Sequence, residues 1–420
     1  MAGEASGMKS LGSSGVLYDE RRDFYIRPNV VKELWTDVAP FLTVVANQST
    51  ISGMADPTFK MFEHRNPWQK QELVLDGADT IGSAEGIAIG TNLIGLECEV
   101  WEASYASKKG VILITGCDAS GDSLTKKDLS ADAVTLADTD ILVVVGNAQA
   151  EGSRSPKAWS DELEVVYNST QIFKTPLQIT GTLLQASLRG ESKELARLRD
   201  QKSAEHKIQK ERAFLFGSNP KGIKGGFADI EGVSNDDGVV RSTMGIIPAL
   251  EKHGSKTGYG QNLFASGDIN EYGKFVDAME KVFQYVPTAG MKRAFVGAGA
   301  LGYFSKQGTD ATANDGAWAK EGGWTVNLGD MKRDTLGFNY RVLETPHGMI
   351  QMIPTPALRG PYNKHMIIVD EDNLFHAQYR APQFQASIQE NDADYVKDQY
   401  FSDEGIGVSM IESHSLMVTP

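Results

Sequence analysis

The sequence predicts an α+β fold in which one long, highly charged helix is set among many short strands. Three observations support this class. Residues 190–218 contain no Pro and are rich in Lys, Glu, Arg, Gln, Leu and Ala, which favour helix. Short β-branched runs separated by Gly and Asp clusters occur between residues 96 and 145. Similar apolar runs return between residues 338 and 413.

The composition is that of a folded, acidic protein. Of 420 residues, 41 are Lys or Arg and 55 are Asp or Glu, for a formal net charge of −14. Because affinity for nucleic acid depends largely on Lys and Arg, this balance argues against a protein that grips DNA. The two cysteines, Cys98 and Cys117, are too few for a disulfide framework and favour a reducing compartment. The first residues lack an apolar signal core, and no run approaches the ~18 apolar residues of a membrane span, so we expect no membrane association.

The segment 29–47 carries apolar side chains at helical spacing, among them Leu34 and Trp35. Pro40 interrupts the pattern, so we predict a short helix, a kink and then an extended piece. The apolar face of this segment needs a surface to cover it, and two alternatives stay open. The segment is either an arm that lies on another molecule or a helix folded back on its own chain.

A β-rich region follows, between about residues 60 and 167. Its β-branched runs predict strands over 96–103, 110–115, 133–136, 141–145 and 163–167. The acidic stretch 118–133 between them is expected to be a loop. Together these runs predict a long excursion that carries a small β lobe.

The long helix over 190–218 is expected to end near Gly217 and Pro220, which are stop signals. Its apolar positions are sparse and its charges many. It is therefore either a solvated surface helix or a strut that crosses a flat, extended protein. His206 lies on this charged helix, and we expect it to be solvated rather than a ligand.

The second half of the chain mixes one amphipathic helix with several strands. Residues 219–262 are rich in Gly, Asp and Asn, which predicts a large loop or a mobile insertion. A helix is predicted over 268–286, with Asp268 and Glu271 at capping-box spacing and Pro287 closing it. The remaining predicted elements are a strand over 292–296, a helix over 300–306, and strands over 338–344, 348–353, 365–370 and 407–413.

The motif Gly297-Ala298-Gly299-Ala300-Leu301-Gly302 matches the GxGxxG pattern of dinucleotide-binding proteins. It follows a predicted strand and opens a helix, as the pattern requires. However, a Gly/Asp/Ala-rich loop replaces the second parallel strand, and Asp330 comes later than the acidic residue that should bind the ribose. Tight packing between the strand and the helix is the better interpretation.

The seven histidines do not form a metal or catalytic pattern. None belongs to an HExxH motif or pairs with a cysteine at zinc-ligand spacing. Asp-rich pieces such as 235–238 and 370–372 lack the ligand spacing of an EF-hand. We therefore expect no catalytic residue, no metal site and no cofactor.

A series of short motifs is more specific. It comprises Asn168-Ser169-Thr170-Gln171-Ile172-Phe173, Gly181-Thr182, Arg189-Gly190, Glu194-Leu195 and, within the charged helix, Glu211-Arg212-Ala213. This series resembles the major head (capsid) proteins of tailed bacteriophages, in the branch that shares the NxTQIF stretch, and these proteins adopt the Hong Kong 97 capsid fold. The order of the parts is similar along most of the chain, beginning with Ala39-Pro40-Phe41-Leu42. Only residues 168–216 are specific in sequence, and the enlarged 65–160 region departs from the pattern.

The resemblance implies a Hong Kong 97-like fold with five parts. They are an N-terminal arm (1–58), an extended loop with an inserted β lobe (59–167), a peripheral domain with the spine helix (168–228), an axial domain (229–344), and a return to the peripheral domain with a C-terminal tail (345–420).

The implied function is structural rather than enzymatic. Such a protein self-assembles into pentamers and hexamers that form the icosahedral head shell of the virion, after assembly in the host cytoplasm. Its partners would be copies of itself and portal, scaffolding and decoration proteins, while packaged DNA faces the shell without specific binding. Two alternatives stay open: an encapsulin-like compartment shell, and a nucleotide-binding enzyme that uses Gly297–Gly302.

Overall fold

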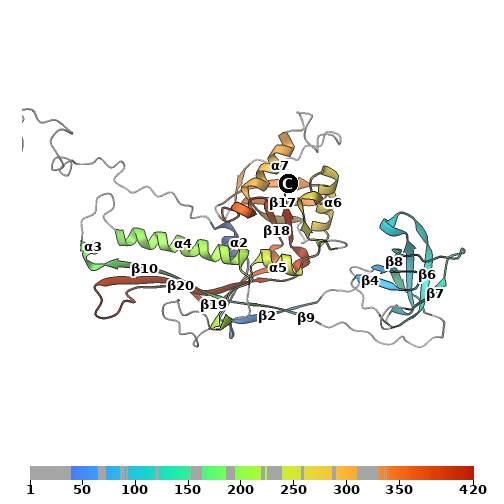
Figure 1. Cartoon of the computed structure of the whole chain (residues 1–420), viewed down its shortest axis with the longest axis horizontal. Helices are drawn as coiled ribbons and strands as arrows, with labels where there is room; N and C mark the ends of the chain where they lie inside the picture. The colour runs from blue at the N-terminus through green and yellow to red at the C-terminus, as the bar shows by residue number, and fades with distance from the viewer. Residues whose placement is uncertain are drawn as a thin grey trace, which may run out of the picture.

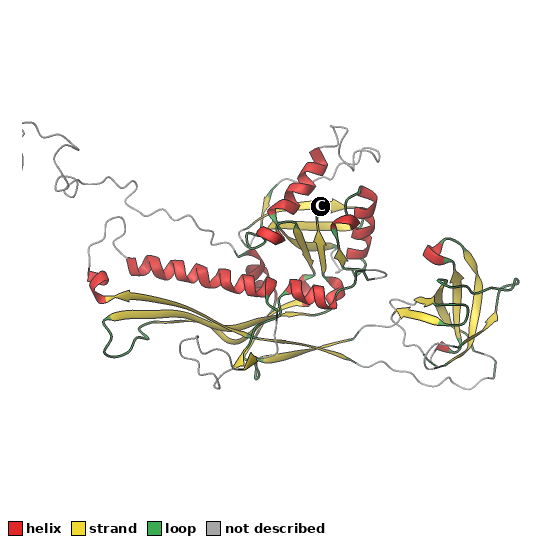
Figure 2. Cartoon of the chain, viewed as in Figure 1, coloured by secondary structure: helices red, strands yellow, loops and turns green. Residues whose placement is uncertain are grey.

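The computed structural model describes residues 39–64, 72–85, 90, 93–118, 123–149, 151–152, 163–185, 194–218, 223–224, 239–256, 260–285, 290–309, 331–334, 336 and 338–420. The molecule is elongated in Figure 1: a long helix lies along a long sheet on one side, and a more compact part with a second sheet adjoins it. A separate β lobe lies at the opposite end. Figure 2 shows helices and strands combined in the part with the long helix and in the compact part, and a lobe built mainly of strands, as expected for an α+β fold.

The long sheet has four strands in the order β1-β19-β20-β10. Their bounds are Thr50–Ser52 (β1), Leu374–Gln385 (β19), Tyr395–Val408 (β20) and Gln171–Thr180 (β10). Helix α4, Glu194–Phe216, lies along this sheet and confirms the predicted long helix. A two-stranded ribbon of β2, Thr58–Glu63, and β9, Glu164–Ser169, leads from the sheet toward the β lobe.

The second sheet has seven strands in the order β13-β21-β18-β14-β17-β16-β15. They span Leu263–Phe264 (β13), Ser415–Val418 (β21), His365–Val369 (β18), Met291–Val296 (β14), Gly348–Pro354 (β17), Asn339–Thr345 (β16) and Lys332–Arg333 (β15). Strands β14, β16, β17 and β18 confirm four predicted strands. Helices α6, Tyr272–Val282, and α7, Ala298–Thr309, lie on this part of the chain, and α7 confirms a predicted helix.

Two hydrophobic cores lie on opposite faces of the seven-stranded sheet, because side chains alternate along a strand. In β14, Phe295 belongs to the core shared with α2 (Pro40–Gln48), α4 and α5 (Ile246–His253), whereas Ala294 and Val296 belong to the core under α6 and α7. The C-terminal turn of α4 contributes Phe214 and Leu215 to the first core. The long helix is thus anchored at one end in the compact part.

The β lobe is a six-stranded sheet with a core of its own. The order is β4-β3-β8-β5-β6-β7, with bounds Ile81–Glu85 (β4), Glu72–Leu75 (β3), Ile141–Asn147 (β8), Leu96–Trp101 (β5), Lys108–Cys117 (β6) and Leu124–Asp128 (β7). Three of the predicted strands are confirmed as β5, β6 and β8. The core contains both cysteines, and burial raises the pKa of the Cys98 thiol to about 12. Both thiols are free and buried, as a structural rather than reactive role requires.

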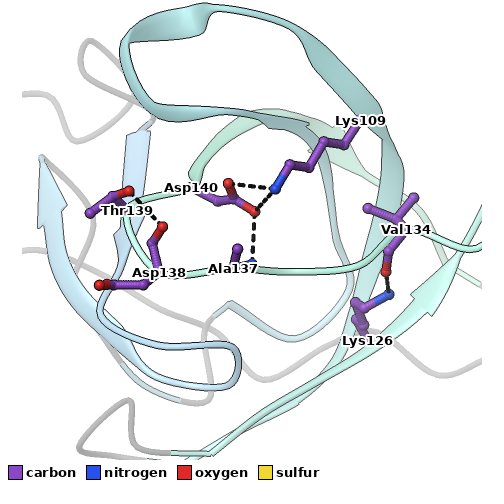
Figure 3. A network of polar contacts seen from close by, with 7 residues as sticks. All are labelled: Lys109, Lys126, Val134, Ala137, Asp138, Thr139 and Asp140. Atoms are coloured by element: carbon purple, nitrogen blue, oxygen red, sulfur yellow. Dashed lines mark hydrogen bonds and ion pairs between the residues drawn. The ribbon is translucent and has the colours of Figure 1, made fainter.

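Two predictions in the lobe were wrong. The acidic stretch 118–133 contains β7, and 133–136 is an irregular segment rather than a strand. Figure 3 shows how polar contacts hold this segment: Lys109 Nζ lies 2.7 and 2.8 Å from the carboxylate oxygens of Asp140, which also accepts from the Ala137 N–H at 2.8 Å. Lys126 donates to the carbonyl of Val134. Val134 and Leu136 are buried in the core of the lobe without joining the sheet.

The prediction for the residues after Pro40 was also wrong. We expected an extended piece, but α2 begins at Pro40 and continues to Gln48. Proline is favoured at the first position of a helix, where its missing N–H would have no partner. Phe41 is fully buried and its ring meets Phe295 edge-on, with 4.9 Å between ring centroids. For this part of the segment, the alternative of a helix folded back on its own chain is confirmed.

Three predictions in the second half need correction. Residues 219–262 are not all loop, because they contain α5, whose apolar face is buried. Helix α6 begins at Tyr272 with Glu271 at its N-cap, and Asp268 instead accepts from the Ala265 N–H in a preceding turn. The predicted strand 407–413 is the end of β20 followed by a 3-10 turn over Ile411–Ser413. Pro287 lies outside the described residues.

Candidate functional site and assembly surface

Helix α4 and strand β20 are joined by a row of polar contacts, which we call the polar ladder. Arg199 pairs with Asp398 (2.7 Å), and Lys210 pairs with Glu404 (3.1 Å). Between them, His206 Nε2 lies 3.0 Å from the Ser402 hydroxyl. Even-numbered residues of β20 share one face of the sheet, and positions 199, 206 and 210 share one side of a helix, so the two patterns match. Asp398 and Glu404 are almost completely buried, so each ion pair fixes the position of α4 against β20.

His206 is buried at the centre of the polar ladder, so the prediction that it is solvated was wrong. Its Nδ1 lies 2.9 Å from the Thr175 hydroxyl, and only 4% of the residue is exposed. Burial and the charge of Lys210 lower the pKa of His206 to about 4, although Glu404 acts in the opposite direction. The ring is therefore neutral near pH 7 and links β10, α4 and β20 by hydrogen bonds.

Glu404 is the most constrained member of the polar ladder. Burial raises its pKa, but the close approach of His376 and the charge of Lys210 outweigh that effect and hold the pKa below its usual value. His376 Nε2 lies 3.4 Å from the carboxylate. A carboxylate buried this deeply is tolerated only with such partners, because an unpaired buried charge costs several kcal/mol.

The NxTQIF stretch of the sequence forms a second junction, centred on the buried side chain of Asn168. Its amide donates to the carbonyls of Met244 (3.0 Å) and Ile406 (2.7 Å). Its oxygen accepts from the N–H groups of Ser169 and Met244, both at 2.8 Å. One side chain thus joins β9, β20 and the loop before α5. The sequence identified this motif, but its role could not be read without knowing that residues 244 and 406 lie beside it.

The Gly297–Gly302 motif packs against its own chain. A side chain at Gly297 would place a Cβ 2.3 Å from the backbone oxygen of Asn363. The first turn of α7 is also occupied: Asn363 accepts from the Gly299 N–H through its side chain (2.9 Å) and from the Ala300 N–H through its backbone (3.1 Å). These donors would be needed to hold a pyrophosphate. The geometry supports the predicted tight packing.

Among the described residues, no group of three or more His, Cys, Asp or Glu side chains could hold a metal ion. Within the same part of the chain, no helix is both long and apolar enough to cross a membrane.

One face of the β2–β9 ribbon is apolar and uncovered; we call it the outer ribbon face. Residues Lys60 and Phe62 of β2 lie opposite Tyr167 and Val165 of β9, on the side away from the body. Phe62 is 69% exposed, Val165 49% and Tyr167 42%, whereas their neighbours Phe59 and Asn168 are buried. Contiguous apolar surface of this kind marks an interaction site. An elongated chain with such a face is typical of one class of protein, the structural subunits of larger assemblies.

A model of the SU10 major capsid protein family matches residues 31–418. The chain therefore belongs to the SU10 major capsid protein family, and its function is to build the shell of a bacteriophage head. No curated protein matches the sequence.

Several solved structures resemble the chain at low identity. The capsid of a native GTA particle is 11% identical, with 95% of each chain covered and a TM-score of 0.43. Microbacterium phage Oxtober96 is 9% identical, with 96% of this chain and 97% of that chain covered and a TM-score of 0.42. The SrpI encapsulin of Synechococcus elongatus PCC 7942 is 6% identical, with 61% and 77% covered and a TM-score of 0.39.

Proposed function

We propose that copies of this chain form pentamers and hexamers, and that the outer ribbon face is one of the contacts between neighbouring copies. The observation that carries the proposal is the exposure of Phe62, Val165 and Tyr167 on a ribbon whose other face is packed against the body. Within a ring of five or six copies such a contact is heterologous, because the ribbon of one copy meets a different surface on the next. Heterologous contacts close into rings when the rotation between copies is suitable.

The parts that we propose for the subunit are those expected from the sequence. We propose an extended loop over 59–167 with the β lobe as an insertion, peripheral parts over 168–228 and 345–420, and an axial domain over 229–344. Strands β17, β18 and β21 fall within 345–420 but belong to the seven-stranded sheet of β14 and β16, so this part of the chain also completes the axial domain. The N-terminal arm is expected at 1–58, but residues 40–52 form α2 and β1 and are built into the body. An arm that reaches a neighbour therefore has to come from the residues before Ala39.

The remaining parts of the proposal concern partners. Portal, scaffolding and decoration proteins are the expected companions of such a shell, which assembles in the host cytoplasm and encloses the phage DNA. The formal net charge of −14 supports a surface that faces DNA without gripping it. The role is structural, without catalysis.

The test is the variant Phe62→Asp in the full-length chain. Because Phe62 is mostly exposed, the substitution should change the stability of the subunit by no more than about 0.5 kcal/mol. A charge in the contact should nevertheless block assembly, because it would be buried without a partner. Negative-stain electron microscopy and size-exclusion chromatography should show soluble subunits or small oligomers instead of shells.

A matched control is Leu129→Asp, which changes an apolar residue of the β lobe that is 49% exposed. This variant should form shells in normal yield, with the same circular dichroism as the wild type. If Phe62→Asp also assembles into normal shells, the outer ribbon face is not a contact between copies.

A further inference from the structure

The β2–β9 ribbon is attached to the body of the subunit at two places along its inner face. At its near end, Asn168 holds the ribbon through the junction described above, and the buried ring of Phe59 meets Phe375 edge-on with 5.7 Å between ring centroids. At its far end, the Oε1 atom of Glu63 accepts a hydrogen bond from the backbone N–H of Met410 at 2.9 Å. Glu63 is the last residue of β2 and is only 2% exposed. We call the contact between Glu63 and Met410 the ribbon latch.

Met410 adopts a backbone conformation that costs energy. Its φ of 47° and ψ of 65° place it in the left-handed region, which residues with a Cβ rarely occupy. Neighbouring contacts hold it there: the Ser409 N–H donates to the Asn373 carbonyl at 3.0 Å, and the Ser413 N–H donates to the Met410 carbonyl at 2.9 Å. Strained backbone that is over-determined by its surroundings often marks a functional position. Here the strained residue supplies the donor of the ribbon latch.

A cavity of about 350 Å³ lies beneath the far end of the ribbon. It is lined by Val166 of β9 and, from the body, by Ala249 of α5 and by Ile411. The inner face of the ribbon is therefore incompletely packed at this end, and apolar contact alone does not fix the angle of the ribbon. Because a hydrogen bond depends on direction as well as distance, the ribbon latch restricts this angle.

The ribbon latch lies directly behind the proposed contact between copies. Phe62 and Glu63 are adjacent in β2, so their side chains point to opposite faces of the ribbon. Phe62 is 69% exposed on the outer ribbon face, whereas Glu63 reaches the body. A change in the angle of the ribbon at Glu63 therefore changes the direction in which Phe62 meets a neighbouring copy.

We propose that Glu63 is a positioning residue for assembly, which fixes through Met410 the direction in which the outer ribbon face meets the next copy. This inference rests on the proposed function, in which that face is a contact between copies. Heterologous contacts close into rings only when the rotation between copies is suitable, and the direction of the ribbon sets this rotation. Without the ribbon latch, copies still bind one another, but the rotation varies and the shells lose their uniform size.

Two substitutions separate the length of the Glu63 side chain from its charge. Glu63→Gln keeps the length and an oxygen that can accept from the Met410 N–H, so it should preserve the ribbon latch. Glu63→Asp keeps the carboxylate but is one methylene shorter, so it should break the ribbon latch. The amide of Met410 should then exchange with solvent about five-fold faster, which is the effect of one typical hydrogen bond. Glu63→Gln is the matched control and should keep the wild-type rate.

The direction of the ribbon is measured within single copies by electron paramagnetic resonance. Spin labels are attached to the full-length chain at Val165→Cys on the ribbon and at Lys252→Cys, an exposed position of α5. The native thiols of Cys98 and Cys117 are buried and should not be labelled. Labelled chain is diluted into an excess of unlabelled chain, so that each distance lies within one copy whether or not shells form. We expect one narrow distance distribution in the wild-type background and in Glu63→Gln, and a broader one in Glu63→Asp.

Shells of unlabelled chain give the second readout. Electron microscopy should show one shell diameter for the wild type and for Glu63→Gln, and several diameters or open sheets for Glu63→Asp. The proposal would be overturned by an unchanged distance distribution or uniform shells in Glu63→Asp, or by a broadened distribution in Glu63→Gln. If Glu63→Asp folds poorly, a broad distribution in the wild-type background would still overturn it. Failure of the proposed contact is recognised separately, because Phe62→Asp would then form normal shells, whereas distances within one copy do not depend on assembly.

Discussion

Replacing Asn168 by Ala should selectively loosen the junction between the long sheet and the compact part. The substitution removes two donated and two accepted hydrogen bonds between 2.7 and 3.0 Å, to Met244, Ile406 and Ser169, and a longer donated one to the Thr243 hydroxyl at 3.4 Å. A typical hydrogen bond contributes about 1 kcal/mol net, and a buried group left without its partner costs about 1–3 kcal/mol. We therefore expect a loss of roughly 4 kcal/mol, a large part of the ~5–15 kcal/mol available to a folded domain.

The β lobe has a core of its own, so a single global unfolding curve would mix two events. Hydrogen exchange measured by mass spectrometry separates them. Amides of β10 and β20 should exchange about 10²–10³ times faster in Asn168→Ala, as a loss of roughly 4 kcal/mol requires when local opening limits exchange. Amides of β5 and β6 in the lobe should be unaffected and serve as the internal reference.

Ser169→Ala is the matched control, because it removes the neighbouring hydrogen bond from the Ser169 hydroxyl to the Ser242 carbonyl (3.0 Å) and leaves the Asn168 amide in place. We expect a loss of about 1 kcal/mol from it. If Asn168→Ala accelerates exchange no more than Ser169→Ala, then the Asn168 amide is not the centre of the junction and the reasoning is refuted.

Two further predictions concern α7 and α2. Gly297→Ala should destabilise the folded chain by about 1–3 kcal/mol, because its Cβ would meet the Asn363 backbone. Gly302→Ala, whose Cβ would meet nothing within 4 Å, should be neutral or stabilising. Equal melting temperatures of the two variants would contradict this prediction. Burial raises the pKa of Glu211 to about 8 from its ordinary 4.5, although the Phe41 and Leu42 N–H groups act in the opposite direction. The folded chain then keeps a proton on Glu211 that the unfolded chain releases, so the contribution of Glu211 to stability should fall as pH rises from about 5 to 8. Glu211→Gln should flatten this slope in denaturant titrations, and an unchanged slope would argue against it.

The strongly patterned elements could be predicted from the sequence. Helix α4 has no Pro and consists of good helix formers, so its local preference agrees with its place in the fold. Strand β18 is an almost continuous apolar run, and β17 is one apart from Gln351, because both faces of their sheet are covered by core. In these cases the local signal and the tertiary environment point to the same structure.

The errors arise where tertiary contacts decide. Pro40 suggests a break in a helix when only the sequence is known, but in the structure helix α2 begins at this residue. The sequence of β20 is polar, but its acidic residues are buried against cations of α4. His206 was predicted to be solvated because its burial against β20 likewise cannot be inferred from the residues around it. A polar residue buried by a partner about 200 positions away has no local signature. The polar ladder could therefore not be predicted from the sequence, although the NxTQIF motif indicated that residues 168–216 carry a specific sequence pattern.

The pairing of β2 with β9 also defines where the chain can be altered. Glu63 and Glu164 are opposed across the end of the ribbon, so the chain leaves the ribbon for the β lobe and returns to it at two points about 5 Å apart. Antiparallel strands that end side by side can be closed by a tight turn. The lobe can therefore be excised and replaced by a two-residue turn, or exchanged for a foreign domain whose termini lie close together, which would make this subunit a carrier for displayed cargo.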